Sequence, residues 1–114
     1  MAVPPPIVVQ ALVDTGASST CLDLNSLAPL GLAQRGTTLI HTPSTGATPV
    51  EAPLYDVRLV LLHVEKKSFC QFDAVPVIGA SLAEQGIQGL IGRDILSECL
   101  FIYDGPSATF TLAF

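Results

Sequence analysis

Three neighbouring residues near the start of the chain, Asp14, Thr15 and Gly16, could carry proton-transfer chemistry. The carboxylate of Asp14 follows the apolar residues 11–13 and stands where a strand would end abruptly. A side-chain carboxylate held in this way can act as a general acid or base. Asp and Gly are also favoured in ordinary turns that end strands. The tripeptide alone therefore leaves both interpretations open.

A second segment makes the first more specific. Residues 89–96 read Gly-Leu-Ile-Gly-Arg-Asp-Ile-Leu, with an apolar pair before Gly92 and a charged pair after it. An apolar strand ending in Asp-Thr-Gly-Ala, followed later by two apolar residues and Gly-Arg-Asp, resembles the retropepsin family. These are one-domain aspartic proteases of retroviruses and of their cellular and bacterial relatives. The resemblance covers roughly Ile7 to Phe114, and its middle part matches in layout rather than in letters.

The resemblance implies a fold and a reaction. The fold would be all-β: a closed barrel with a flap hairpin and one or two short helices, formed by residues 1–114 as a single domain. The reaction would be hydrolysis of a peptide bond by water held between two carboxylates that share one proton. The ionised carboxylate takes a proton from the water, and the protonated one polarises the scissile carbonyl.

Only one Asp-Thr-Gly is present, so one chain would hold half of this site. The other aspartates lack a following Thr-Gly or Ser-Gly: Asp23, Asp56, Asp73, Asp94 and Asp104. A two-fold homodimer would supply the second Asp14 carboxylate from an identical chain. Dimerisation is therefore a requirement of the implied mechanism.

The resemblance also implies residue roles in the first motif. Asp14 would be the catalytic acid or base, and Thr15 would hydrogen-bond across the two-fold axis. Gly16 would allow the tight turn and offer its carbonyl to the substrate backbone. Ala17 would lie beside it in the cleft floor.

Further implied roles fall in the middle of the chain and in the second motif. Gly92 would pack beneath the active loop, and Arg93 would open a helix and brace the loop. The flap would run from about residue 40 to residue 50, with Gly46 near its tip. It would close over an extended peptide and exclude water.

Two departures from the viral pattern limit what can be transferred. Ser18 stands where the viral enzymes usually have an aspartate that pairs with the helix arginine, so Arg93 needs another partner. Cellular and bacterial relatives often carry serine there, which favours that branch. Little chain precedes Val13, and the prolines at 4–6 cannot donate hydrogen bonds in a strand ladder. The interleaved termini of the viral dimer are therefore not expected here, although residues 109–114 could contribute to an interface.

Most of the remaining sequence predicts strands. The strand-like segments are residues 6–13, 37–40, 54–65, 70–74, 100–103 and 108–114. Within the third segment, Tyr55, Val57, Leu59 and Leu61 share one face. The opposite face begins charged and turns apolar from Val60 onward, so we expect that end to be buried on both faces.

Two short helices are expected. Ser81 to Glu84 fits a capping box, in which the glutamate side chain reaches back to the cap, and Gly86 limits the helix that follows. Residues 93–99 would form the other helix, with Asp94 in its first turn, where the helix dipole favours an acid. Strands and helices together predict a mostly β domain, either a small barrel or a sandwich.

Composition narrows the class of protein and its partners. The chain has 114 residues, 49% of them hydrophobic and 13% charged, which suits one folded domain with apolar surface left for a partner subunit or a peptide groove. A net charge of −5 without any basic run argues against nucleic acid and anionic membranes as partners. Residues 1–6 lack the features of a signal peptide, which favours the cytoplasm.

No metal or organic cofactor is expected. Cys21, Cys70 and Cys99 are odd in number and match no zinc-site spacing, so we expect small buried side chains. His41 and His63 have no accompanying serine or cysteine motif and are expected to be surface or hydrogen-bonded histidines.

Two functional classes follow. The first is an active homodimeric endopeptidase that prefers extended substrates with apolar side chains near the cut and works best at mildly acidic pH. The second is a retropepsin-like module used for dimerisation or peptide binding with little or no catalysis, since a fold does not fix a function.

Overall fold

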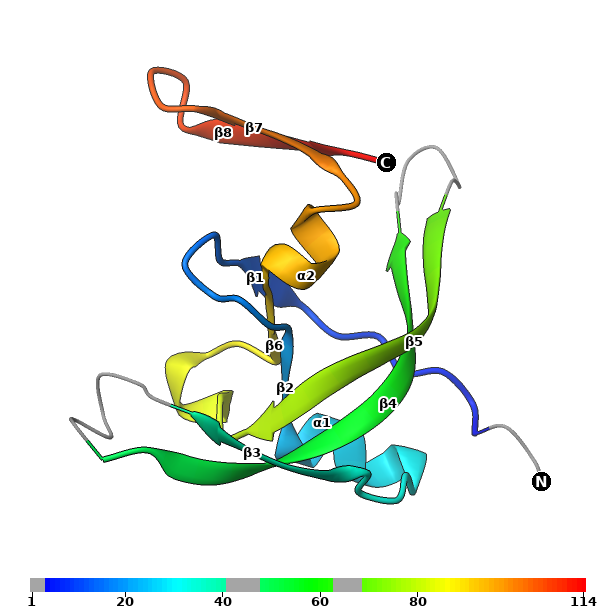
Figure 1. Cartoon of the computed structure of the whole chain (residues 1–114). Helices are drawn as coiled ribbons and strands as arrows, with labels where there is room; N and C mark the ends of the chain where they lie inside the picture. Colours follow the sequence, from blue (N-terminus) through cyan, green and yellow to red (C-terminus); the bar gives the residue numbers. More distant parts are fainter. Residues whose placement is uncertain (1–3, 41–47, 63–68) are drawn as a thin grey trace.

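The structure, a computed structural model, describes residues 4–40, 48–62 and 69–114 (Figure 1). These residues form mostly strands with a few short helices, which confirms the predicted all-β class. In chain order the elements are β1 (Ala11–Val13), β2 (Cys21–Asp23), α1 (Leu24–Leu27), the 3-10 helix η1 (Ala28–Leu30), β3 (Gly36–Ile40), β4 (Val50–Leu62), β5 (Phe69–Ala80), the 3-10 helix η2 (Ala83–Gln85), β6 (Gly89–Ile91), α2 (Arg93–Leu96), β7 (Leu100–Asp104) and β8 (Thr109–Ala113).

Six strands form one curled sheet in the order β1-β6-β2-β5-β4-β3. β1 pairs in parallel with β6 at one edge of the sheet, and β2 pairs in parallel with β5 at its centre, so segments far apart in sequence lie side by side. The remaining neighbours are antiparallel. We expected a closed barrel. In the described part of the chain β1 and β3 are instead the two edges, and the sheet curls without closing (Figure 1).

The longest strand, β4, carries the predicted inward face. Val57 is buried, and Tyr55, Leu59 and Leu61 pack against the core cluster. The expectation for the opposite face of β4 is wrong, because Val60 and Leu62 are exposed at the far end of the hairpin. The buried core cluster consists of Leu22, Leu27, Val57, Val75, Val77, Ile91 and Ile95.

The first strand is shorter than predicted. β1 covers Ala11–Val13, whereas the sequence predicted a strand from residue 6. Gln10, the residue just before β1, is bonded to Gln88 in two ways. Gln10 N–H donates to Gln88 Oε1 at 2.8 Å, and Gln88 N–H donates to the Gln10 carbonyl at 3.1 Å. Prolines further upstream lack the N–H that a ladder needs, which explains why pairing does not extend to them.

The capping box predicted for Ser81 is also wrong. The helix η2 begins after Leu82 and has no side-chain cap from its own segment. The buried carboxylate of Asp23 takes this role from a distant strand, because its Oδ1 accepts from Leu82 N–H at 2.8 Å and from Ala83 N–H at 3.0 Å. Its Oδ2 accepts from Asn25 N–H at 3.1 Å and so caps α1 as well. One carboxylate therefore joins the starts of two helices.

The second predicted helix begins where expected and ends early. α2 starts at Arg93 after Gly92 and ends at Leu96, with Ser97 as its cap, rather than continuing to Cys99. None of the helices in the described ranges is long and apolar enough to span a bilayer.

Protonation of Asp23 should weaken the fold at low pH. The hydrogen bond from Leu82 N–H lowers the pKa of the Asp23 carboxyl, with further lowering by Ala83, Asn25 and Ser26 N–H, and burial opposes the shift. A lowered folded-state pKa means that this stabilisation is complete above the unfolded pKa of about 3.9 and is lost as pH falls through the folded value.

The urea midpoint of Asp23→Asn should therefore lie below that of the wild type at pH 7, and the gap should shrink as pH falls from about 4 toward 2. The exposed Glu51→Gln should show no such gap at pH 7. A gap that stays constant over this pH range would contradict the assignment.

The chain ends in a hairpin, β7 and β8, which lies above α2 and away from the six-stranded sheet (Figure 1). Phe101 and Phe110 contact each other within it, with ring centroids 5.8 Å apart. Much of the hairpin surface is apolar, and the following side chains are each at least 48% exposed: Leu100, Ile102, Tyr103, Phe110 and Phe114. Such a surface is typical of a segment that packs against another protein.

Candidate active site

Asp14 lies at the carboxyl end of β1, where β1 and β6 run in parallel and Val13 pairs with Ile91. Its backbone N–H donates to the Ile91 carbonyl at 2.9 Å, so the neighbouring strand fixes where the loop begins. The half-buried carboxylate accepts from Gly16 N–H through Oδ1 at 2.9 Å. A side chain on Gly16 would bring its Cβ within 3.2 Å of that same oxygen, so the carboxylate would have to move by a few tenths of an ångström.

The first residue of helix α2, Arg93, hydrogen-bonds to the Asp14 loop. Arg93 donates its backbone N–H to the Ala17 carbonyl at 2.8 Å and its Nη1 to the Thr15 carbonyl at 2.8 Å. Gly92 permits this contact, because a Cβ there would lie 2.7 Å from the Ser19 carbonyl carbon and oxygen. Ser18 has no carboxylate with which Arg93 could pair. The Arg93 guanidinium instead bonds the Thr15 carbonyl.

A further contact, which the sequence did not reveal, fixes the far end of the loop. Thr20 is fully buried, and its Oγ1 donates to Asp94 Oδ1 at 2.8 Å while its N–H donates to Asp94 Oδ2 at 3.0 Å. Gly92 N–H donates to the same threonine hydroxyl at 3.2 Å. Asp94 lies in the first turn of α2, as expected, and its carboxylate also bonds Thr20. No local pattern pairs two residues so far apart in sequence.

One carboxylate, not two, belongs to this loop. Each of the other aspartates has partners of its own in the described structure: Asp23 with Leu82 and Ala83, Asp56 with Arg35, Asp73 with Gln71, Asp94 with Thr20, and Asp104 with Ser107. No hydrogen bond in the described ranges joins Asp14 to another carboxylate. Within the described residues, the Asp14 loop therefore offers one carboxylate to a reaction that needs two.

Comparison with known proteins agrees with this geometry. A family described as aspartyl protease matches residues 7–95, which include both the Asp14 loop and the start of α2. The chain belongs to this aspartyl protease family. The retropepsin-like resemblance is thereby confirmed, and the family supports a hydrolase of the peptidase class. No curated protein and no solved structure matches the chain.

Within the aspartyl protease domain, Cys21 lies next to the active loop on β2. Its thiol contacts the Ser19 carbonyl, with a sulfur-to-oxygen distance of 3.8 Å. Burial raises the pKa of the Cys21 thiol, and the charges of Asp94 and Asp14 raise it further. The thiol is therefore held protonated at neutral pH, which argues against a cysteine nucleophile at this site. All three cysteines are free and half-buried rather than fully buried as expected.

Some predicted features of the protease lie outside the described residues. Gly46 and most of the flap are among them, as are His41 and His63. The strands that flank the flap are described, and β3 and β4 pair up to Ile40 and Val50. Within residues 4–40, 48–62 and 69–114, no group of three or more His, Cys, Asp or Glu side chains is arranged to hold a metal ion.

Proposed function

We propose that the protein is an endopeptidase that works as a homodimer, with one Asp14 carboxylate from each chain sharing a proton. The observation that carries this proposal is the single Asp14 carboxylate in a loop anchored on both sides, by β6 and by α2. General acid–base hydrolysis needs a pair of such groups, and a two-fold axis beside the loop supplies the second.

In this mechanism the ionised Asp14 takes a proton from a water molecule, which then attacks the scissile carbonyl. The protonated Asp14 of the other chain polarises that carbonyl and donates its proton to the oxygen, and the leaving nitrogen takes a proton from the pair as the C–N bond breaks. Gly16 N–H holds Oδ1 of each Asp14, so Oδ2 is free to face the water. The Arg93 contacts keep the loop rigid, which preserves the geometry on which the rate depends.

The dimer axis should pass close to Thr15. This residue is exposed at the turn, where its hydroxyl can bond to the other loop. Leu12 on the edge strand β1 is 53% exposed, and the β7–β8 hairpin adds a second apolar surface. Burying both would contribute to the roughly 1,200–2,000 Å² that stable interfaces cover.

The substrate would be an extended peptide lying between the active loops and the flaps. The hairpin formed by β3 and β4 leads into residues 41–47, and we assign the flap to this hairpin with Gly46 near its tip. Gly16 would offer its carbonyl to the substrate backbone, and Ala17 would lie beside the substrate in the cleft floor. Side chains near the cut should be apolar, because they would be enclosed by apolar walls.

Cleavage of an unbiased peptide pool, followed by mass spectrometry from about pH 4 to 7, tests this function. We expect cuts within extended peptides, with a rate that is highest at mildly acidic pH. The rate should fall when the pair is doubly ionised or doubly protonated. A confirmed dimer that binds peptides and cuts none over this range would contradict the endopeptidase proposal and favour a binding module.

A further inference from the structure

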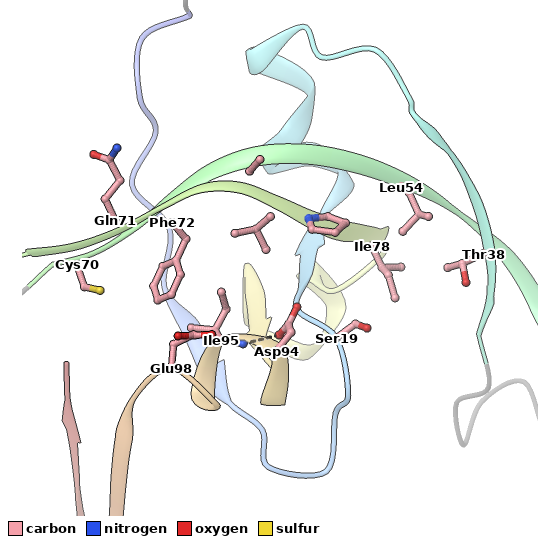
Figure 2. A pocket seen from close by; sticks show the side chains of 13 residues that line it. Ser19, Thr38, Leu54, Cys70, Gln71, Phe72, Ile78, Asp94, Ile95 and Glu98 are labelled. Carbon is pink, nitrogen blue, oxygen red and sulfur yellow. Dashed lines mark hydrogen bonds between the residues drawn. The ribbon is translucent and has the colours of Figure 1, made fainter.

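A hollow of about 750 Å³ lies between the β4–β5 hairpin and the helix α2 (Figure 2). Ser19 and Thr38 line one end of it, and Cys70 and Gln71 line the other. Its volume is within the roughly 300–1,000 Å³ range of pockets that bind small molecules. The proposed chemistry at Asp14 does not use this space.

The walls of the hollow combine apolar surface with negative charge. Leu54, Phe72 and Ile78 face it from β4 and β5, Asp94 faces it from α2, and Glu98 faces it from the segment that follows α2 (Figure 2). No lysine or arginine is among the described residues that line it. Asp94 is held in place by Thr20, whereas Glu98 is exposed and can turn toward a ligand. A long apolar stem that ends in a positive charge matches such walls.

We infer that this hollow binds a lysine or arginine side chain of the peptide substrate, at a position away from the cut. The inference rests on the proposed endopeptidase function and adds a substrate class to it. Ser19 belongs to the segment that follows the active loop and packs against Gly92, and Thr38 is on β3 just before the proposed flap. A peptide that leaves the cleft between these two residues enters the hollow.

In a two-fold dimer each chain would carry one hollow, and the two hollows would lie at opposite ends of an extended peptide. Basic residues should therefore be favoured on both sides of the scissile bond, at matching distances from it, while the residues beside the cut stay apolar.

The test uses a peptide of known cleavage by this protein, in which one lysine is moved outward a position at a time on each side of the cut. Norleucine, which keeps the stem and lacks the charge, replaces the lysine in a parallel series. Catalytic efficiency (kcat/KM) is measured for the wild type, for Glu98→Gln, and for Glu84→Gln. The last is a matched control, because Glu84 is an exposed acid on η2 outside the hollow and its change removes the same charge.

We expect lysine to exceed norleucine by about fivefold at one distal position on each side, as for a partly exposed ion pair. The preference should be lost in Glu98→Gln, persist in Glu84→Gln, and weaken as salt is raised. Cleavage with no lysine preference at any position, or a preference that survives Glu98→Gln unchanged, would overturn the inference and leave the proposed function standing.

A binding measurement distinguishes failure of the lysine-site inference from failure of the proposed endopeptidase function. Fluorescence anisotropy with a labelled lysine peptide and its norleucine twin can be read on Asp14→Asn, which needs no catalysis. Tighter binding of the lysine peptide that depends on Glu98 would support the inference even if no peptide were cut. Equal binding of the two peptides would overturn it.

Discussion

Replacing Asp14 by Asn should reduce cleavage by about 10²- to 10⁴-fold or more, because the pair then has no ionised carboxylate to take a proton from water. The fold should remain, since the amide oxygen of Asn can still accept from Gly16 N–H as Oδ1 does now. The measurement is kcat/KM on a cleaved peptide, with dimer content and thermal midpoint checked in parallel.

A matched control for this change is Asp73→Asn. Asp73 carries the same chemical group on an exposed part of β5, outside the Asp14 loop and the C-terminal hairpin, where its Oδ1 accepts from Gln71 Nε2 at 2.6 Å. Its replacement should leave the rate unchanged within about twofold, as is usual for surface positions. Equal cleavage by wild type and Asp14→Asn would mean that the activity comes from another residue or another protein.

Charged residues on the C-terminal hairpin should prevent dimerisation and, with it, catalysis. Tyr103 and Phe110 are opposite each other on β7 and β8 and are 71% and 58% exposed. The double change Tyr103→Lys and Phe110→Glu keeps the hairpin paired through opposite charges, while it removes two aromatic anchors. We expect the dimer dissociation constant to rise at least about 30-fold, as when one interface hot spot is lost.

The chain offers a close control for that experiment at the far end of the β4–β5 hairpin. Leu62 and Phe69 are also an exposed cross-strand pair, each 62% exposed. Leu62→Lys with Phe69→Glu should leave dimerisation unchanged in sedimentation velocity experiments. A hairpin variant that stays dimeric at low concentration, or a β4–β5 variant that dissociates equally, would place the interface elsewhere.

The sequence predicted the elements whose signals are local. Asp14 and Gly92 were found because an apolar strand followed by a tight turn, and an apolar pair followed by a short helix, are patterns of adjacent residues. The inward face of β4 followed from simple alternation, and its centre at Val57 is buried as expected. β7 and β8 fall on the strand-like segments predicted at residues 100–103 and 108–114.

The features that were missed depend on contacts between distant residues. In the sequence alone, Asp23 resembles a surface aspartate. It caps η2 in place of Ser81 only because the fold brings β2 next to η2. The pairing of Thr20 with Asp94 is of the same kind. The end of β4 at Leu62 was predicted to be buried on both faces and is exposed. An apolar run favours burial, but it does not identify a segment that covers it.

The most direct test of the shared Asp14 pair is to titrate wild-type enzyme with Asp14→Asn subunits. The wild-type concentration is fixed well above the dimer dissociation constant, and the subunits are allowed to exchange before the rate is measured. Asp14→Asn that also carries the Tyr103→Lys and Phe110→Glu changes is the control, because it should not enter dimers and should not inhibit.

If each dimer needs both Asp14 carboxylates, a threefold excess of mutant subunits should lower the rate to about one quarter, since mixed dimers are inactive and take up wild-type chains. A rate that stays constant or rises as mutant subunits are added, while mixed dimers demonstrably form, would mean that one Asp14 suffices and would contradict the shared site.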